Sequence, residues 1–351
     1  MRVALVLPVH DWRQCAAAAQ AAEALGVDVV QTNETKHDPF APLAIAGLAT
    51  ERISLATSVA IAFPRSPMIV ANQAWDLERQ TRGRFTLGLG SQVKGHNERR
   101  FSVPWVAPAA RMGEYVESLR AIWRSWETGA KLDYQGKHYR FTLMNEEFSP
   151  GPNHLPMVPV TIAAVGPLML KTAARLCDGV RLHLFATRKY IEETVAAILS
   201  AELDGRGMAR ENFEVSGGGF VVSGPDSRAV AASLERTRHR VAFYASTPAY
   251  RPVLDAHGLG ELGQRLFEMS RRGEFDRMAP LVSDEVLELF VASGTYDQLP
   301  AAIERRFGGI VDTVTLDLAP DGDRKTALKL VDAIHRIPSR FEGFKTEASQ
   351  P

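Results

Sequence analysis

The most constraining feature of this chain is a strand–helix–strand pattern between residues 53 and 96. Two runs rich in apolar and β-branched residues, Ile53–Ala62 and Arg84–Leu89, flank a helix-patterned segment, Pro67–Arg79. A crossover of this length joins neighbouring parallel strands. In α/β barrels and in open α/β sheets, ligands bind at the carboxyl ends of such strands. The small and polar residues that end these two strands therefore mark the expected site.

The same alternation continues along the chain. We count eight predicted strands, nearly all separated by helical segments, and a long helical region from Ser227 to Ser293 after the seventh strand, Phe213–Val222. A doubly wound open sheet is the alternative, but no G-x-G-x-x-G motif follows the first strand. We therefore expect an α/β fold with a single domain over residues 1–340. It is a (β/α)8 TIM barrel with insertions after strand 4 and strand 7, followed by a C-terminal tail over residues 341–351.

Composition excludes several classes of protein. Lys and Arg together number 41, as do Asp and Glu, and this zero net charge disfavours a nucleic-acid-binding protein. The sequence lacks an apolar run long enough to span a membrane. The two cysteines, Cys15 and Cys177, fall in helix patterns, so we expect neither a disulfide framework nor a metal site. These features favour a cytoplasmic protein.

Several short motifs are each ordinary alone, but their order and spacing along the chain are specific when taken together. Thr57-Ser58-Val59 closes the third strand, and Gly83-Arg84-Phe85 and Gly88-Leu89-Gly90 bracket the fourth. Ala163–Pro167 joins the fifth strand to its helix, and Asp178-Gly179-Val180 begins the sixth strand. On these motifs the chain resembles the luciferase-like superfamily of flavin- and deazaflavin-dependent enzymes. It is most similar to the branch that uses coenzyme F420.

The resemblance implies a cofactor site built from three segments. Thr57, Ser58 and Val59 would form a flat ledge for the tricyclic ring, with a non-proline cis peptide between Ser58 and Val59. The phosphate would lie between the fourth and fifth strand ends, where unpaired amides at a helix N-terminus attract anions. The alternative for all of these residues is an ordinary strand end or helix cap. The predicted phosphate-binding residues are Gly90, Ser91, Gln92, Ala164, Val165 and Gly166.

The end of the second strand is the predicted catalytic position. Relatives often place an acid–histidine pair there, whereas here Thr35 follows Glu34 and His37 comes two places later. A histidine near neutral pH suits proton transfer. We predict that His37 or Glu34 handles the proton; the alternative is that the loop histidine has no role.

Four further residues are predicted to line the substrate cavity. His10 and Trp12 follow the first strand, with Trp12 as an apolar wall, and Lys94 and His96 follow the fourth. Sequence alone does not decide whether His183, on the sixth strand, faces the site or the interior of the barrel.

The resemblance implies an oxidoreductase that transfers a hydride between coenzyme F420 and a small organic substrate. That substrate would be an alcohol, a carbonyl compound or a molecule with an activated double bond. An FMN-dependent monooxygenase of the same fold is the alternative enzyme, and a non-catalytic flavin-binding barrel is the alternative outside catalysis. We expect a small-molecule substrate and a homodimer, with neither nucleic acid nor membrane as a partner.

Overall fold

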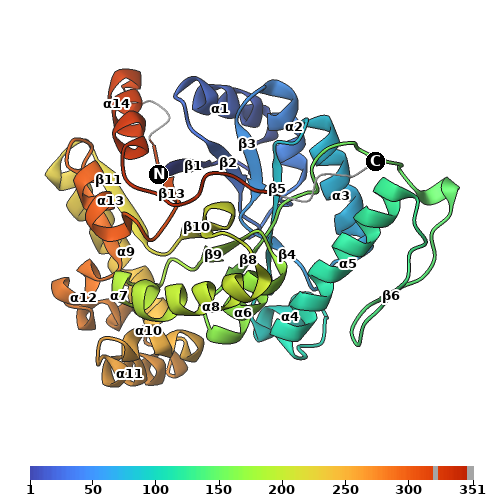
Figure 1. Ribbon diagram of the computed structural model, residues 1–351. Coiled ribbons are helices and arrows are strands. Elements are labelled where there is room, and N and C mark those ends of the chain that lie inside the picture. The colour runs from blue at the N-terminus through green and yellow to red at the C-terminus, as the bar shows by residue number, and fades with distance from the viewer. Residues whose placement is uncertain (319–322, 346–351) are drawn as a thin grey trace.

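The computed structural model describes residues 1–318 and 323–345 and has the predicted (β/α)8 barrel (Figure 1). All neighbouring barrel strands are parallel, and the ring closes because β3 pairs with β5 as well as with β2. The barrel strands are β1 (Arg2–Val6), β2 (Val29–Thr32), β3 (Ser54–Thr57), β5 (Phe85–Gly90), β8 (Val160–Ala164), β9 (Gly179–Leu182), β10 (Glu214–Gly217) and β13 (Thr313–Leu316).

Helices between the strands form the outer layer, and local signals set their ends. The Ser66 hydroxyl accepts a hydrogen bond from the Met68 amide and so caps α3, with Pro67 in the first turn. Gly129 ends α5 at a φ of 72°, a backbone conformation that glycine adopts readily. The outer helices are α1 (Trp12–Ala24), α2 (Ala41–Ala49), α3 (Pro67–Gln80), α5 (Pro108–Thr128), α6 (Pro167–Leu176), α8 (Ala196–Arg206), α13 (Leu299–Phe307) and α14 (Arg324–His335). A short helix, α7 (Arg188–Tyr190), and a π-helical turn, η2 (Ile191–Val195), precede α8.

The core lies between the barrel strands and these helices. Along α5, Tyr115, Leu119, Trp123 and Trp126 are buried, as their spacing of three and four residues predicts. Cys15 and Cys177 are buried and unbridged. No helix in the described part of the chain is long and apolar enough to cross a membrane.

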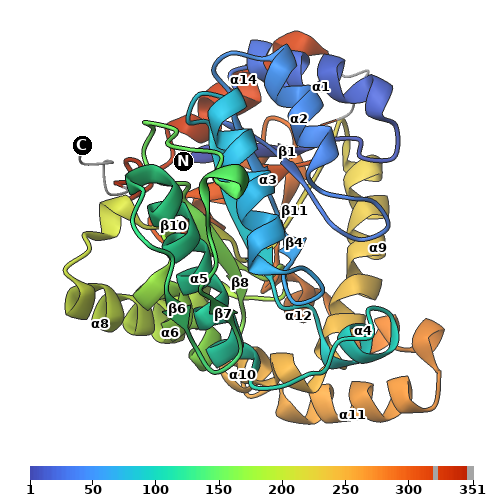
Figure 2. The ribbon, with the colours of Figure 1, turned by 90° about the vertical axis from the view of Figure 1, so that its right-hand side faces the viewer.

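Two insertions interrupt the regular alternation, after the fourth and seventh barrel strands as predicted. The helices α4, α10, α11 and α12 from these insertions lie at one end of the molecule (Figure 2). The first contains α4 (Lys94–Arg99), the hairpin β6 (Tyr134–Gln135) and β7 (Arg140–Phe141), and η1 (Glu146–Phe148). The second contains α9 (Ser227–Ala245), η4 (Pro248–Tyr250), α10 (Arg251–Asp255), α11 (Gly260–Arg271), η5 (Phe275–Arg277), η6 (Ala279–Leu281) and α12 (Asp284–Glu288).

Two of the predicted strands are broken. The third barrel strand divides into β3 and β4 (Ala60–Ile61) on either side of a cis peptide bond between Ser58 and Val59. The seventh ends at Gly217, whose φ is 84° and where a side-chain Cβ would lie 2.5 Å from the Leu182 carbonyl oxygen. Only glycine fits this combination of backbone conformation and close approach.

The chain beyond Gly217 leaves the barrel. There β11 (Phe220–Gly224) forms a separate parallel pair with β12 (Val291–Thr295). The predicted helical region up to Ser293 is therefore wrong at its end. Residues 291–295 are a strand because their backbone pairs with β11, which is a long-range contact that local periodicity does not report.

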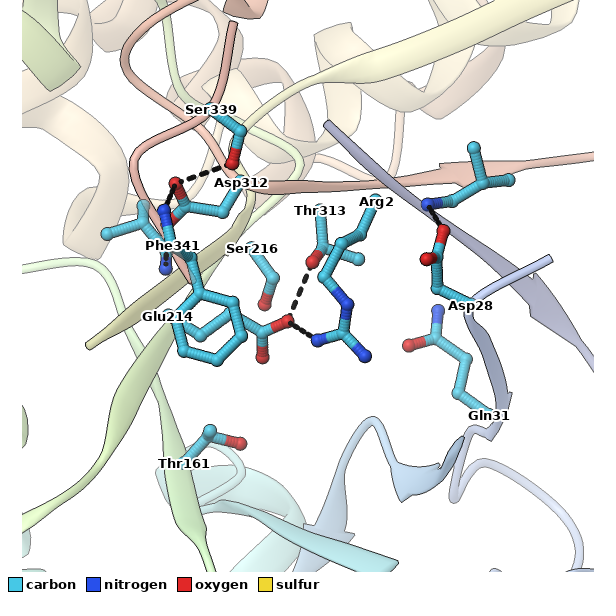
Figure 3. A network of polar contacts seen from close by, with 12 residues as sticks. Arg2, Asp28, Gln31, Thr161, Glu214, Ser216, Asp312, Thr313, Ser339 and Phe341 are labelled. Carbon is cyan, nitrogen blue, oxygen red and sulfur yellow. Dashed lines mark hydrogen bonds and ion pairs between the residues drawn. The ribbon is translucent and has the colours of Figure 1, made fainter. Parts of the chain in front are cut away.

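The amino-terminal end of the barrel is closed by polar side chains (Figure 3). Arg2 Nη1 lies 2.9 Å from Glu214 Oε1, and the Thr313 hydroxyl donates to the same oxygen at 2.6 Å. Asp312 Oδ1 accepts hydrogen bonds from Arg340 N and Phe341 N, which fixes the beginning of the C-terminal tail beside the barrel. Residues 346–351 of the predicted tail lie outside the described residues.

Candidate active site

The three predicted cofactor-binding segments lie at the ends of adjacent strands. In the register, Ile61 on β4 pairs with Gly90 on β5, and Leu89 pairs with Ile162 on β8. At position 90 a Cβ would lie 2.5 Å from the Val59 Cγ2 atom, so glycine allows the ledge to approach β5 closely. Segments up to 105 positions apart in the sequence (Val59 to Ala164) thus form one continuous surface.

Within the ledge, the Thr57 side chain joins two strands. Its hydroxyl donates to the Gly88 carbonyl at 2.7 Å and accepts from the Gly88 amide at 2.8 Å, and the side chain is fully buried. Thr57 therefore contributes to the ledge through its backbone, whereas Ser58 is half-buried. The cis peptide bond that the resemblance implies lies between Ser58 and Val59.

The N-terminus of α6 is open to an anion. Gly166 is its N-cap and makes no side-chain hydrogen bond, and a Cβ at this position would meet no heavy atom within 4 Å. The amides in the first turn of an uncapped helix favour negative charge, as does the helix dipole. The Tyr190 hydroxyl donates to the Val165 carbonyl at 3.1 Å and fixes the preceding residue. Ala164, at the end of β8, is buried.

The neighbouring loop is shaped by Asn97. Its Nδ2 atom donates to the carbonyls of Ser91 and Val93 at 2.8 and 3.1 Å, and the side chain is completely buried. Gln92 adopts a left-handed φ of 57°, and its side-chain oxygen accepts from the Val93 amide at 2.9 Å. These contacts hold Gly90–Gln92 beside the ledge.

The predicted catalytic residues have different surroundings. Glu34 Oε2 accepts hydrogen bonds from Ile61 N at 2.6 Å and from Arg65 Nη1 at 2.7 Å. This links the second strand end to the segment that follows the ledge. His37 is exposed, in the loop between Glu34 and Asp38, and Asp38 Oδ2 lies 3.6 Å from Arg65 Nη2.

The predicted substrate residues are exposed at the ends of two strands. Trp12, half exposed, begins α1 immediately after His10 and the N-cap Asp11. In α4, His96 is exposed, and Lys94 Nζ lies 3.9 Å from Glu98. Their contact with a substrate remains a prediction.

The structure places His183 in an aromatic cluster formed with the second insertion. Its ring stacks on Tyr250 at 4.6 Å between centroids and meets Tyr244 edge-on at the same distance. Its Nδ1 atom accepts from the Phe185 amide at 3.0 Å, so the proton of the neutral ring is on Nε2. Burial, with a smaller contribution from Arg240, lowers the pKa of His183 to about 4. His183 is therefore a neutral hydrogen-bond donor at neutral pH.

Sequence reasoning did not single out Arg181. This residue lies on β9 two positions before His183 and is almost completely buried inside the barrel. Arg181 points to the interior of the barrel, where it contacts Thr161 on β8 and Gln31 on β2, and His183 follows the carboxyl end of β9. A charged residue within the strand sequence Gly179–Leu182 was the available signal.

Other features of the structure lie elsewhere. One cavity of about 430 Å³ is lined by residues that include Arg120, Asp178 and Arg206, and another of about 450 Å³ lies between α2 and α3. In the described ranges, no group of three or more His, Cys, Asp and Glu side chains is placed to hold a metal ion.

The chain is an α/β barrel in which the backbone ledge at Thr57–Val59 lies near the uncapped N-terminus of α6. Residues 2–313 match the model of the luciferase-like monooxygenase family, and the chain belongs to this family. Membership makes it an oxidoreductase.

Relatives cover most of the chain. An uncharacterised protein of Mycobacterium tuberculosis is 43% identical over 304 residues, covering 86% of this chain and 89% of that protein. A putative coenzyme F420-dependent oxidoreductase of the same organism is 28% identical, covering 80% and 83%. The solved structure of the coenzyme F420-dependent tetrahydromethanopterin reductase of Methanopyrus kandleri matches with a TM-score of 0.74 at 20% identity, covering 94% and 96%. At 20% identity, the similarity to this solved structure shows a shared fold.

Proposed function

We propose that the chain is a coenzyme F420-dependent oxidoreductase that transfers a hydride to or from a small alcohol, carbonyl compound or activated double bond. The observation that carries the proposal is the convergence of Thr57–Val59, Gly90–Gln92 and Ala164–Gly166 on adjacent strand ends. The names of two similar proteins, which include this coenzyme, give further support.

The residues present fit such a cofactor. A planar ring needs a surface with small side chains, which Ser58 and Gly90 provide. A phosphate needs free amides, which α6 offers in its first turn after Pro167, a residue that has no N–H itself. When bound, the deazaflavin would donate or accept the hydride, and the protein would bind and orient it.

The contacts at the second strand end support different roles for its two candidates. The Glu34 oxygen that faces the ledge is already bonded to Arg65 and to the Ile61 amide. Glu34 is therefore suited to hold the ledge in place. His37 is exposed and suited to exchange a proton with the substrate and solvent.

The substrate would lie between the ring and the second insertion. In the described chain, His183 Nε2 and the hydroxyls of Tyr244 and Tyr250 have no hydrogen-bond partner. They offer polar contacts within an aromatic wall, which suits a small organic molecule with one oxygen atom. We also propose a homodimer, which sedimentation analysis would test.

Turnover tests the proposal. Small alcohols with oxidised F420, and enones with reduced F420, should change the absorbance of the coenzyme when the enzyme is added. With an active substrate, His37→Ala should lower kcat by about 100-fold or more. Glu34→Gln should instead raise the Kd for the coenzyme, because the ion pair with Arg65 that holds the ledge is lost and only a weaker neutral hydrogen bond can replace it.

The exposed neighbour Lys36 gives the control, because Lys36→Ala should leave both constants close to those of the wild type. If His37→Ala turned over substrate at the wild-type rate, His37 would not be the proton-transfer residue. Activity with reduced FMN and oxygen, in the absence of activity with F420, would favour a monooxygenase.

A further inference from the structure

A single arginine spans the inside of the barrel directly beneath the ledge. From β9, Arg181 Nε donates to the Thr161 hydroxyl on β8 at 2.8 Å. Its Nη1 atom contacts Gln31 Oε1 on β2 and the Ser58 hydroxyl, each at 3.4 Å. In the closed strand order, β2 lies opposite β9. The guanidinium therefore crosses the barrel and reaches the ledge from inside.

Strand β5 leaves room for the Arg181 side chain because it has a glycine at position 88. At Gly88 on β5, a Cβ would lie 2.7 Å from Arg181 Nε and 2.0 Å from the Thr57 carbonyl oxygen. Any larger residue would displace either the arginine or the ledge. Gly88 and Arg181 thus form one packing unit with the backbone of the third strand.

Within the described part of the chain, the positive charge of Arg181 has no ion-pair partner. The nearby Glu214 is bonded to Arg2 and Thr313. Two guanidinium groups therefore share one carboxylate inside the barrel, an excess of one positive charge. Burial lowers the pKa of Arg181, yet an arginine side chain stays protonated in proteins.

The other charged groups near the ledge do not cancel this excess. Glu34 and Arg65 pair with each other beside the ledge, and Asp317, which follows β13, is exposed to solvent. Above the ledge, His183 is neutral at neutral pH. A buried charge without a partner is costly, and such a charge marks a place where an anionic group is favoured.

We propose that Arg181 is a positioning and specificity-determining residue, which holds Ser58 from below and favours a bound ring that carries negative charge. The inference rests on the proposed function, in that a deazaflavin lies on this ledge. The ring of coenzyme F420 carries a weakly acidic hydroxyl, whereas the FMN ring has none. Arg181 would therefore select the ionised deazaflavin over the neutral flavin.

The test is a pH titration of the absorbance of coenzyme F420 bound to the wild type, to Arg181→Lys and to Arg181→Met. The wild type should lower the pKa of the ring hydroxyl by about one pH unit relative to free coenzyme, which is the order of effect that one unit charge has inside a protein. Arg181→Lys should keep most of the shift because it keeps the charge. Arg181→Met should abolish it.

A second variant keeps the test decisive if Arg181→Met does not fold. Glu214→Gln removes the one carboxylate of this network and should lower the pKa of the bound ring further. The inference would be overturned if the ring hydroxyl of bound F420 had the same pKa in Arg181→Met as in the wild type. Where only Glu214→Gln folds, an unchanged pKa of that hydroxyl in this variant would overturn it. Either result would leave the proposed function intact. Failure of the wild type to bind F420 would overturn the proposed function itself.

Discussion

Glu78 illustrates how burial of one carboxylate makes the stability of this barrel depend on pH. It lies in α3, almost inaccessible to solvent, and its Oε2 atom accepts a hydrogen bond from the Phe85 amide at 3.0 Å. Burial raises the pKa of Glu78 to about 8, although the amide contact acts in the opposite direction. The side chain thus joins α3 to the start of β5 mainly in its protonated form.

The raised pKa of Glu78 sets the sign of its contribution to stability. In the unfolded chain the group titrates near 4.3, so its contribution is full below that pH and is lost as the pH rises through 8. The free energy of unfolding of the wild type should therefore fall between pH 5 and pH 9. Glu78→Gln should remove this part of the fall, as measured by urea denaturation at several pH values.

The exposed Asp76, two residues earlier on the same helix, provides a matched control. Asp76→Asn should preserve the wild-type dependence on pH. A parallel decline in Glu78→Gln and the wild type would show that Glu78 is ionised in the folded protein at neutral pH.

At this scale, the sequence located residues better than it defined their contacts. Thr57 and Glu34 were predicted as site residues, and the structure places Thr57 at the end of β3 and Glu34 just beyond β2. However, Thr57 uses its hydroxyl on Gly88, and Glu34 uses its carboxylate on Arg65. These partners are about thirty residues away, and only the fold determines their distance. Arg181 was missed for the same reason.

Among the structural elements, α6 is where one substitution should weaken coenzyme binding without lowering the stability of the fold. Gly166 has an ordinary φ of −90° and open space around its missing side chain. Gly166→Asp should cap the helix and leave stability unchanged or raised by a few tenths of a kcal/mol. The same carboxylate would repel the phosphate of the coenzyme, so its Kd should rise at least about tenfold, as measured by fluorescence titration.

Gly166→Ala serves as the control because it fits the space without adding charge, and it should bind the coenzyme nearly as well as the wild type. If Gly166→Asp bound the coenzyme with unchanged affinity, the phosphate would lie elsewhere.

The boundaries of the elements show what periodicity can predict. Strand–helix alternation and the cap residues gave the barrel and most of its helices, because these signals are local. The breaks after Thr57 and Gly217, and the strand β12, depend on pairing with distant strands. Local sequence does not encode those partners.

For the whole molecule, barrel closure is what creates the site. β3 pairs with β5, and β5 pairs with β8. These pairings place Thr57–Val59, Gly90–Gln92 and Ala164–Gly166 side by side, although they are far apart in the sequence. The count of eight strands predicted this architecture, and the insertions after the fourth and seventh strands supply helices at one end of the molecule (Figure 2).

The central claim is that this surface binds a deazaflavin in preference to a flavin. Titration of the purified protein with coenzyme F420 and, separately, with FMN, followed by fluorescence quenching, tests it most directly. We predict saturable F420 binding with a Kd at least about tenfold lower than that for FMN, a difference of about 1.4 kcal/mol. Tight binding of FMN with no binding of F420 would contradict the account.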